Sequence, residues 1–206
     1  MLSYKTIEPH TLELLKSIMK ESLFSDMRLV GGTALALQYG HRQSVDLDVF
    51  GKMPENSDAM EDVLSGIGDL QIIKVSERIR IYFIDKIKVD FVDYSRYTWI
   101  DSPVEENGIR LASPKDIAAM KVNAAEGRGT KKDFIDIYFL LQHYSLADIL
   151  GFYNKKYPEH SEFRALMSLT YFEDAEEQLM PKMFKHVSWE NIKADILKAV
   201  DGYKGR

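Results

Sequence analysis

Hydrophobic and polar positions change their spacing about half-way along the chain. Up to residue 112, short apolar runs with a period of two are typical of strands, and stretches with helical spacing separate them. The segment from Ser44 to Phe50 alternates strictly and predicts one strand. Three β-rich runs should form a meander whose tightest turn is Asp85-Lys86: residues 70–75, 78–84 and 87–92. Helical spacing in this part falls on residues 7–24, 33–39 and 54–66.

After residue 112 the β-branched alternation disappears and helical spacing takes over. Ser113 and Pro114 supply a capping residue and a proline at the first helical position, and Thr130 offers a cap for the next helix. Further helices are expected over residues 145–157, 160–169 and 188–203. The pattern therefore predicts an α/β (α+β) fold, in which a core with a mixed sheet over residues 1–112 is followed by a helical bundle over residues 113–206 that packs against it.

Composition limits the classes of protein that fit this pattern. The chain has 206 residues, of which 45% are hydrophobic and 29% are charged, as in ordinary soluble domains. It contains no cysteine, which excludes disulfides, thiolate metal sites and a cysteine nucleophile and suits a reducing compartment. No apolar run approaches the ~18 residues of a membrane span, and Met1 to Glu8 lacks the apolar core of a signal peptide. We therefore expect a cytoplasmic protein without membrane association.

The acid pair Asp46 and Asp48 carries the clearest chemistry. Two positions apart on a strand, both carboxylates leave the same face about 7 Å apart along the chain, and hard oxygen ligands of this kind suit Mg²⁺ or Mn²⁺. Such pairs also occur on solvated strand faces, so the pair alone leaves both interpretations open. Gly31-Gly32 lies upstream, with thirteen residues between Gly32 and Asp46. Glycines at a strand-to-helix turn let backbone amides approach a phosphate closely.

A third acid, Asp90, lies in an apolar strand where both of its sequence neighbours point to the opposite face. Its carboxylate can therefore join those of Asp46 and Asp48 if the two strands are neighbours. Asp93 is close by but faces the other way, so only one of the two can reach the same cations. Three carboxylates around two divalent metals are what an in-line phosphoryl or nucleotidyl displacement requires.

Three blocks of the chain together form a known arrangement: Leu29 to Leu37 with the glycine pair, Gly40 to Ser44, and Val45 to Phe50 with the acid pair. They resemble the AbiEii/AbiGii toxin family, nucleotidyltransferases of the DNA polymerase β superfamily found in type IV toxin–antitoxin and phage-defence systems. The helical half of that family also has a lysine, a basic loop and a late acid pair, which are matched here by Lys121, Arg128 and the segment Asp133 to Tyr138. The resemblance covers roughly residues 25–143.

The resemblance implies a polymerase β-like nucleotidyltransferase core and a division of labour within it. Asp46, Asp48 and Asp90 would bind Mg²⁺ or Mn²⁺, with Asp90 also acting as the base toward the acceptor. The residues that would contact the NTP are Gly31, Gly32, Thr33, Arg42, Ser44, Lys121 and Arg128. Lys121 would neutralise the triphosphate, and Asp136 would orient Lys121 or the nucleotide. Whether Asp133 or Asp136 is the functional acid stays open, because Asp133 also fits a helix cap.

By the same resemblance, the protein would transfer an NMP from an NTP to a hydroxyl of RNA (tRNA) or of a protein, and a cognate antitoxin would restrain it. The net charge of −5 disfavours binding of nucleic acid through overall charge but is compatible with a local basic patch.

Other interpretations stay open beside this one. An Asp-x-Asp sugar-nucleotide glycosyltransferase would need a nucleotide-binding βαβ half before the motif, but only 45 residues precede Asp46. A non-catalytic nucleotide-binding relative would tolerate the loss of one acid, yet all three are present. The glycine pair also fits a plain tight turn, Arg42 a surface position, and Lys121 a side chain that reaches solvent from the border of an apolar seam.

Overall fold

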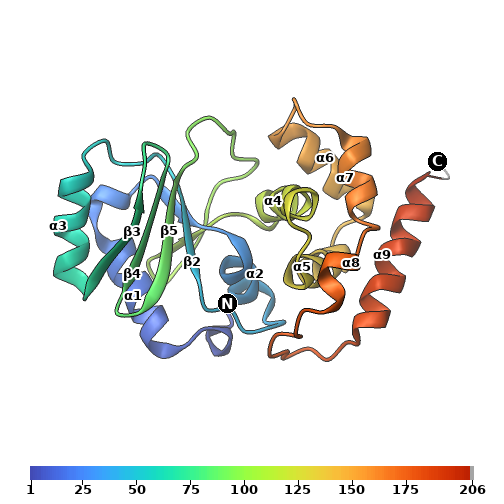
Figure 1. The fold of residues 1–206 in the computed structure, drawn as a ribbon, viewed down its shortest axis with the longest axis horizontal. Helices are drawn as coiled ribbons and strands as arrows, with labels where there is room; N and C mark the ends of the chain where they lie inside the picture. The colour runs from blue at the N-terminus through green and yellow to red at the C-terminus, as the bar shows by residue number, and fades with distance from the viewer. Residues whose placement is uncertain (205–206) are drawn as a thin grey trace. The chain divides into compact units, whose positions relative to one another are not determined.

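The computed structural model describes residues 1–204, which form two compact units (Figure 1). The first unit comprises residues 1–98 and 102–112, and the second comprises residues 99–101 and the chain from Ser113 onward. The last two residues of the predicted helical region, 205–206, lie outside the described residues.

The first unit is built around a seven-stranded sheet with the strand order β3-β4-β5-β2-β1-β7-β6. Its strands are β1 (Met27–Leu29), β2 (Leu47–Gly51), β3 (Leu70–Val75), β4 (Ile79–Ile84), β5 (Ile87–Asp93), β6 (Val104–Glu106) and β7 (Ile109–Leu111). The pairs β2–β5 and β1–β7 are parallel, and the other neighbouring pairs are antiparallel. The predicted mixed α/β class is confirmed.

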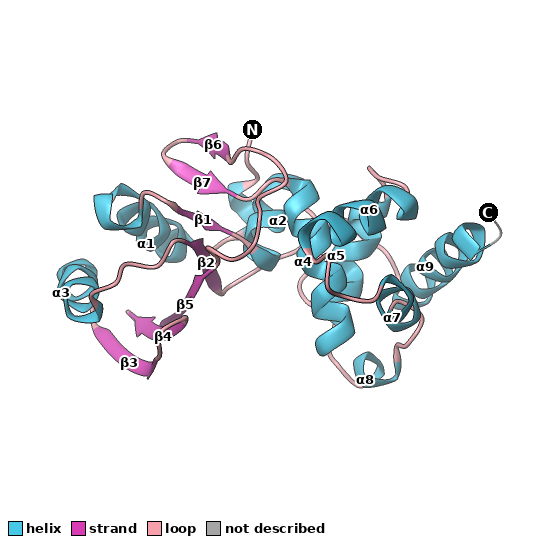
Figure 2. Cartoon of the chain, turned by 90° about the horizontal axis from the view of Figure 1, so that it is seen from above, coloured by secondary structure: helices cyan, strands magenta, loops and turns pink. Residues whose placement is uncertain are grey.

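Helices lie on both faces of this sheet. Helices α1 (Pro9–Lys20) and α3 (Ser57–Ile67) cover one face, and α2 (Gly31–Tyr39) lies on the other (Figures 1 and 2). The short 3₁₀ turns η1 (Tyr4–Thr6) and η2 (Ser22–Phe24) flank α1. In the buried core, Phe24 stacks on Phe91 with ring centroids 5.1 Å apart, and Tyr82 meets Phe91 edge-on. The core side of the sheet thus fills with apolar side chains and leaves the polar positions of β2 and β5 to the opposite face.

The predicted meander is present as β3, β4 and β5, which pair in sequence order. Asp85 and Lys86 form its tight turn with φ values of 50° and 66°, as a type I′ hairpin requires. Strand β3 lies at the edge of the sheet, is mostly exposed, and has a register shift between Ile72 and Lys74. Such an irregularity blunts an edge that could otherwise pair with another chain.

Two helix boundaries differ from the predictions by three or more residues. The helix predicted over residues 7–24 ends at Lys20, because Glu21 takes an extended conformation with φ −69° and ψ 126° before η2 begins. The helix predicted over residues 54–66 begins at Ser57, because the Asn56 side chain caps it and accepts hydrogen bonds from two backbone amides.

The strand predicted over Ser44 to Phe50 begins only at Leu47. The Ser44 amide donates to the carbonyl of Thr6 at 2.9 Å, and the Asp46 carbonyl accepts from the Thr33 hydroxyl. Residues 44–46 therefore bond to helical segments instead of a neighbouring strand, and Asp46 lies one position before the strand.

Strands β6 and β7 are absent from the sequence predictions. They flank a two-residue turn of Asn107 and Gly108, both with positive φ (52° and 77°). Asn-Gly between apolar positions is a strong hairpin signal, and it is the feature that could have revealed this pair.

The second unit is helical, as predicted. Its helices are α4 (Pro114–Gly127), α5 (Lys131–Leu141), α6 (Leu146–Lys156), α7 (Glu162–Ser168), α8 (Glu173–Glu176) and α9 (Trp189–Lys204). The predicted caps are in place, since Ser113 accepts from the Asp116 amide and Thr130 forms a capping box with Asp133. None of the helices in residues 1–204 is long and apolar enough to cross a membrane.

Residues 99–101 belong to the second unit because they are tied to the start of α4. Asp116 accepts hydrogen bonds from the amides of Ile100 and Asp101 at 2.8 and 3.3 Å. The same carboxylate forms an ion pair with the fully buried Lys156 at 2.8 Å, and the Lys156 ammonium lies 4.7 Å from the ring centroid of Trp99.

Candidate active site

A left-handed glycine begins helix α2 directly after β1. The Val30 amide donates to the Asp48 carbonyl at 2.8 Å, which fixes the end of β1 against β2. Gly31 then has φ +67°, and a Cβ atom at this position would overlap Oδ2 of Asp48. Gly31 is therefore more than a turn residue, because it lets the helix start directly against the acid strand.

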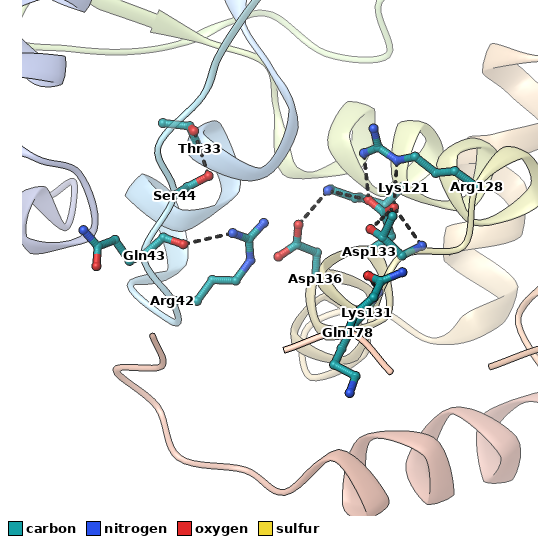
Figure 3. A network of polar contacts seen from close by, with 11 residues as sticks. Thr33, Arg42, Gln43, Ser44, Lys121, Arg128, Lys131, Asp133, Asp136 and Gln178 are labelled. Carbon is teal, nitrogen blue, oxygen red and sulfur yellow. Dashed lines mark hydrogen bonds and ion pairs between the residues drawn. The ribbon is translucent and has the colours of Figure 1, made fainter. Parts of the chain in front are cut away.

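The second glycine makes room for an arginine. A Cβ atom on Gly32 would overlap Nη2 of Arg42 and come within 3.4 Å of the Ser44 hydroxyl. Arg42 is only 2% exposed, and its Nη1 donates to the Gln43 carbonyl at 3.0 Å (Figure 3). The alternative of a surface position for Arg42 is wrong.

The first turn of α2 is bonded to the segment before β2. Thr33 Oγ1 donates to the Asp46 carbonyl at 2.5 Å and lies 2.9 Å from Oγ of Ser44 (Figure 3). The structure thus brings together all the predicted nucleotide contacts of the first unit, which are Gly31, Gly32, Thr33, Arg42 and Ser44.

The acid strands are neighbours, as the prediction for Asp90 required. Strands β2 and β5 pair in parallel with Asp48 opposite Asp90, so the two side chains lie side by side on one face, about 4.8 Å apart in the backbone. Oδ2 of Asp90 is 2.6 Å from Nζ of Lys88. Oδ1 of Asp90 is buried and has no hydrogen-bond partner.

The described part of the chain holds no preformed cluster of three carboxylates. Within residues 1–204, no three histidine or acidic side chains are close enough together to hold a metal ion. Asp46 is exposed and precedes β2, because its segment is bonded to α2. The described residues therefore supply a pair, Asp48 and Asp90, and a role for Asp46 as a ligand stays a prediction.

The nearby Asp93 is used for local structure. Its register partner is Gly51, three positions beyond Asp48. Its carboxylate accepts from the Met53 amide at 3.3 Å and from the Ser95 hydroxyl at 2.8 Å. Asp90 is the acid that shares a row with Asp48.

The predicted residues of the second unit form a network of buried charges between α4 and α5 (Figure 3). Nζ of Lys121 lies 2.9 Å from Oδ1 of Asp133 and 2.7 Å from Oδ2 of Asp136. The Lys121 side chain is 6% exposed and both carboxylates are fully buried. Arg128, with a side chain that is 64% exposed, adds two hydrogen bonds to Asp133 at 3.0 and 3.1 Å. Asp133 is both a helix cap and an ion-pair partner, so the two acids share Lys121.

These cations also control the ionisation of Asp133. Burial alone would raise the pKa of its carboxyl group, but the Lys121 ammonium, the Arg128 guanidinium and the Thr130 hydroxyl outweigh burial and lower the pKa to about 2. The carboxylate is consequently charged throughout the neutral range.

Sequence reasoning missed Lys88 and the contact between Lys121 and Asp133. Lys88 lies two positions before Asp90, so the period of a strand already places both on one face. Asp133 and Asp136 are three apart on α5 and hence share a helix face. The sequence spacings of Lys88 to Asp90 and of Asp133 to Asp136 could therefore have indicated both contacts.

Comparison with known families assigns the chain to one of them. A model of the family described as nucleotidyl transferase AbiEii toxin, type IV TA system, matches residues 13–202. The chain belongs to the AbiEii family. It is accordingly a nucleotidyltransferase, and the glycosyltransferase and non-catalytic alternatives are set aside.

This AbiEii protein is also similar to a curated protein and to solved structures. An uncharacterized protein of Aquifex aeolicus (strain VF5) is 33% identical over 197 residues, which cover 93% of this chain and 94% of the relative. The solution structure of the antibiotic-resistance factor ANT(2'')-Ia is similar with a TM-score of 0.52 and 15% identity, covering 69% of this chain and 86% of that one. Its crystal structure in complex with adenylyl-2''-tobramycin has the same TM-score at 11% identity, covering 73% and 96%. These structures show that the polymerase β-like nucleotidyltransferase fold is shared.

Proposed function

We propose that this AbiEii protein transfers an NMP from an NTP to a hydroxyl group and releases pyrophosphate, with Mg²⁺ or Mn²⁺ as its cofactor. The observation that supports this most is the position of Gly31 against Asp48, with Asp90 beside Asp48 on the same sheet face. A turn that can approach phosphates thus adjoins a carboxylate pair that can hold a divalent cation.

The donor set fits such a cation. A buried carboxylate oxygen without a partner, such as Oδ1 of Asp90, is costly unless a donor or cation meets it. Mg²⁺ commonly binds one or two carboxylates and takes its remaining ligands from water and substrate phosphates. Asp48 and Asp90 would hold it, with Asp46 added from the residue before β2. When bound, the cation would neutralise phosphate charge and favour ionisation of the attacking hydroxyl.

The triphosphate is proposed to lie over the first turn of α2. The positive end of the helix and the amides of Gly31 and Gly32 favour an anion there. Thr33 and Ser44 hold the neighbouring loop through their hydroxyls, and Arg42 adds a cation beside Gly32. Substrate phosphates would thus meet donors on one side and the carboxylate pair on the other.

Transfer then follows an in-line displacement. The acceptor hydroxyl oxygen attacks the α-phosphorus, the bond from that phosphorus to the bridging oxygen of the β-phosphate breaks, and pyrophosphate leaves. Asp90 is proposed to accept the hydroxyl proton, while the backbone amide of Gly31 helps to keep the α-phosphate in line.

Lys121 and Arg128 are proposed to bring positive charge to the nucleotide, with Asp133 and Asp136 fixing their positions. Lys121 is nearly buried between two carboxylates, whereas two-thirds of the Arg128 side chain is exposed. Arg128 should therefore contribute more to phosphate binding and Lys121 more to the integrity of the α4–α5 pair.

The acceptor is proposed to be a hydroxyl of RNA, such as a tRNA end, or of a protein. Membership of a family described as a type IV toxin supports a cognate antitoxin as the partner that restrains the activity.

A labelling experiment tests the proposal. The purified protein is incubated with Mg²⁺, total RNA or total protein, and each NTP labelled in turn at the α- or the γ-phosphate. We expect label from the α-phosphate on one class of acceptor and none from the γ-phosphate. Label from the γ-phosphate alone would contradict NMP transfer.

Two substitutions on one strand identify the acid that acts. Asp90→Asn should lower labelling about 100-fold or more, because it removes the proposed base and a cation ligand. Asp93→Asn removes the same charge three positions away and should keep most of the activity, since Asp93 serves local hydrogen bonds. The reverse outcome would mean that the wrong acid has been assigned.

A further inference from the structure

Lys88 and Asp90 face the same side of β5 and are joined by a short ion pair. Nζ of Lys88 lies 2.6 Å from Oδ2 of Asp90, with side-chain exposures of 40% and 21%. Within residues 1–204 this is the one ion pair of Asp90, and its other oxygen is buried without a hydrogen-bond partner. Within the described residues, Lys88 is thus the side chain that forms an ion pair with this carboxylate.

A second carboxylate lies beside Asp90. Asp48 lies opposite it in the parallel ladder, so two carboxylates are adjacent on a partly buried face. Two neighbouring carboxylates disfavour each other's charged form unless positive charge lies between or beside them. Lys88 supplies that charge from a flexible, half-exposed stem that can move into solvent.

We propose that Lys88 is a built-in counter-cation, which stabilises Asp90 while no metal is bound and which the divalent cation must displace. The inference rests on the proposed function, because it concerns the same carboxylate pair. Lys88 is a positioning residue, since it acts through Asp90. It lowers the affinity for free metal and makes binding depend on the phosphates that accompany the metal.

A matched control lies on the same sheet face. Asp90 pairs with Ile81, and Ile81 pairs with Lys74, so Lys74 lies two strand spacings, about 9.6 Å, from Asp90 in the same row. Lys74→Met removes the same charge without removing a contact to Asp90. Lys88→Arg keeps a cation and tests whether charge at that position is sufficient.

The experiment is a titration of the full-length protein with Mn²⁺, read by electron paramagnetic resonance of the free ion. It is carried out with and without a non-hydrolysable NTP analogue. Lys88→Met should bind Mn²⁺ about fivefold to tenfold more tightly than the parent without nucleotide, and the difference should shrink with nucleotide present. Lys74→Met and Lys88→Arg should stay within twofold of the parent. Melting temperatures should show that metal-free Lys88→Met is folded but less stable, and that Mn²⁺ raises its melting temperature more than that of the parent.

Two results would overturn the inference alone, and a third would overturn the proposed metal site together with it. If the parent binds Mn²⁺ and Lys88→Met binds it equally or more weakly, Lys88 does not compete with the metal. If Lys74→Met tightens binding as much as Lys88→Met, only overall charge matters. If the parent and Lys88→Met both fail to bind Mn²⁺ even with nucleotide, the proposed metal site itself is wrong, and the inference fails with it.

Discussion

The backbone conformation of Gly31 and the position of the Asp48 carboxylate both depend on the absence of a Cβ atom at residue 31. The residue has a positive φ, and the volume of a side-chain carbon is already filled by the Asp48 carboxylate. Any other residue must both strain the backbone and push the acid out of its row with Asp90.

Gly31→Ala should therefore lower the free energy of unfolding by about 2 kcal/mol and remove most transferase activity. The matched control is Gly66→Ala in helix α3, where a Cβ atom would meet no neighbour within 4 Å. That change should be neutral or stabilise the protein by up to about 1 kcal/mol. Urea unfolding and the labelling assay measure both effects. Full activity in Gly31→Ala would show that the turn does not position the acid.

Four charged side chains join helices α4 and α5. Lys121 and Arg128 offset Asp133 and Asp136, and Asp133 also caps α5. Buried carboxylates with this many partners make the stability of a helix pair depend on pH.

Stability should fall between about pH 4 and pH 2 as Asp133 is protonated. The pKa of this buried carboxyl is about 2 in the folded protein, against an ordinary value of 3.8. A lowered pKa stabilises the fold above the ordinary value, and this contribution, about 2 kcal/mol, is lost as the pH falls toward 2. Urea unfolding at several pH values should show that Asp133→Asn lacks this part of the loss, whereas Asp195→Asn on the exposed side of α9 retains it. Parallel pH profiles for the parent and Asp133→Asn would exclude the assignment.

On the scale of the whole molecule, the chain passes between its two units three times: after residues 98, 101 and 112. The middle excursion, residues 99–101, is held by Asp116, which also neutralises the buried Lys156. One carboxylate thus anchors a connecting segment and balances a buried charge.

Asp116→Ala should cost about 3–5 kcal/mol of unfolding free energy, because Lys156 stays buried after losing its carboxylate. Asp101→Ala is the control, since its ion pair with Lys115 lies at the surface and is worth at most about 1 kcal/mol. Thermal unfolding compares the two variants. Equal losses would mean that burial of the pair does not matter.

Much of this architecture could be predicted, because a strand or helix that buries one face has apolar residues at regular spacings in the sequence. The meander and the long helices bury alternate or every third and fourth positions, so their spacing reveals them. Contacts set by tertiary structure leave no such pattern. The three-residue strands β6 and β7 are too short to show alternation, and the late start of β2 depends on Thr33, which lies thirteen residues before Asp46.

In the candidate site, too, the residue types could be predicted from the sequence, whereas their tertiary contacts could not. The glycine pair and the acids are visible as residue types at fixed spacings. Strand pairing determines that Asp90 is the acid beside Asp48. Helix packing determines that Lys121 forms ion pairs with both Asp133 and Asp136. Burial of Arg42 likewise depends on the absence of a side chain at Gly32.

The parallel pairing of β1 with β7 has a consequence for the order in which the protein is made. Leu29 pairs with Leu111, 82 positions later (111 − 29), and the Arg110 guanidinium bonds to the carbonyls of Met19, Phe24 and Met27. A ribosome adds about 5–20 residues per second, so the edge of β1 that β7 covers stays unpaired for several seconds after β1 has been made, whereas the other edge can pair with β2 much earlier. The Gly31-Gly32 turn that follows β1 is thus encoded early, but the strand that covers this edge of β1 is complete only once residue 111 has been made.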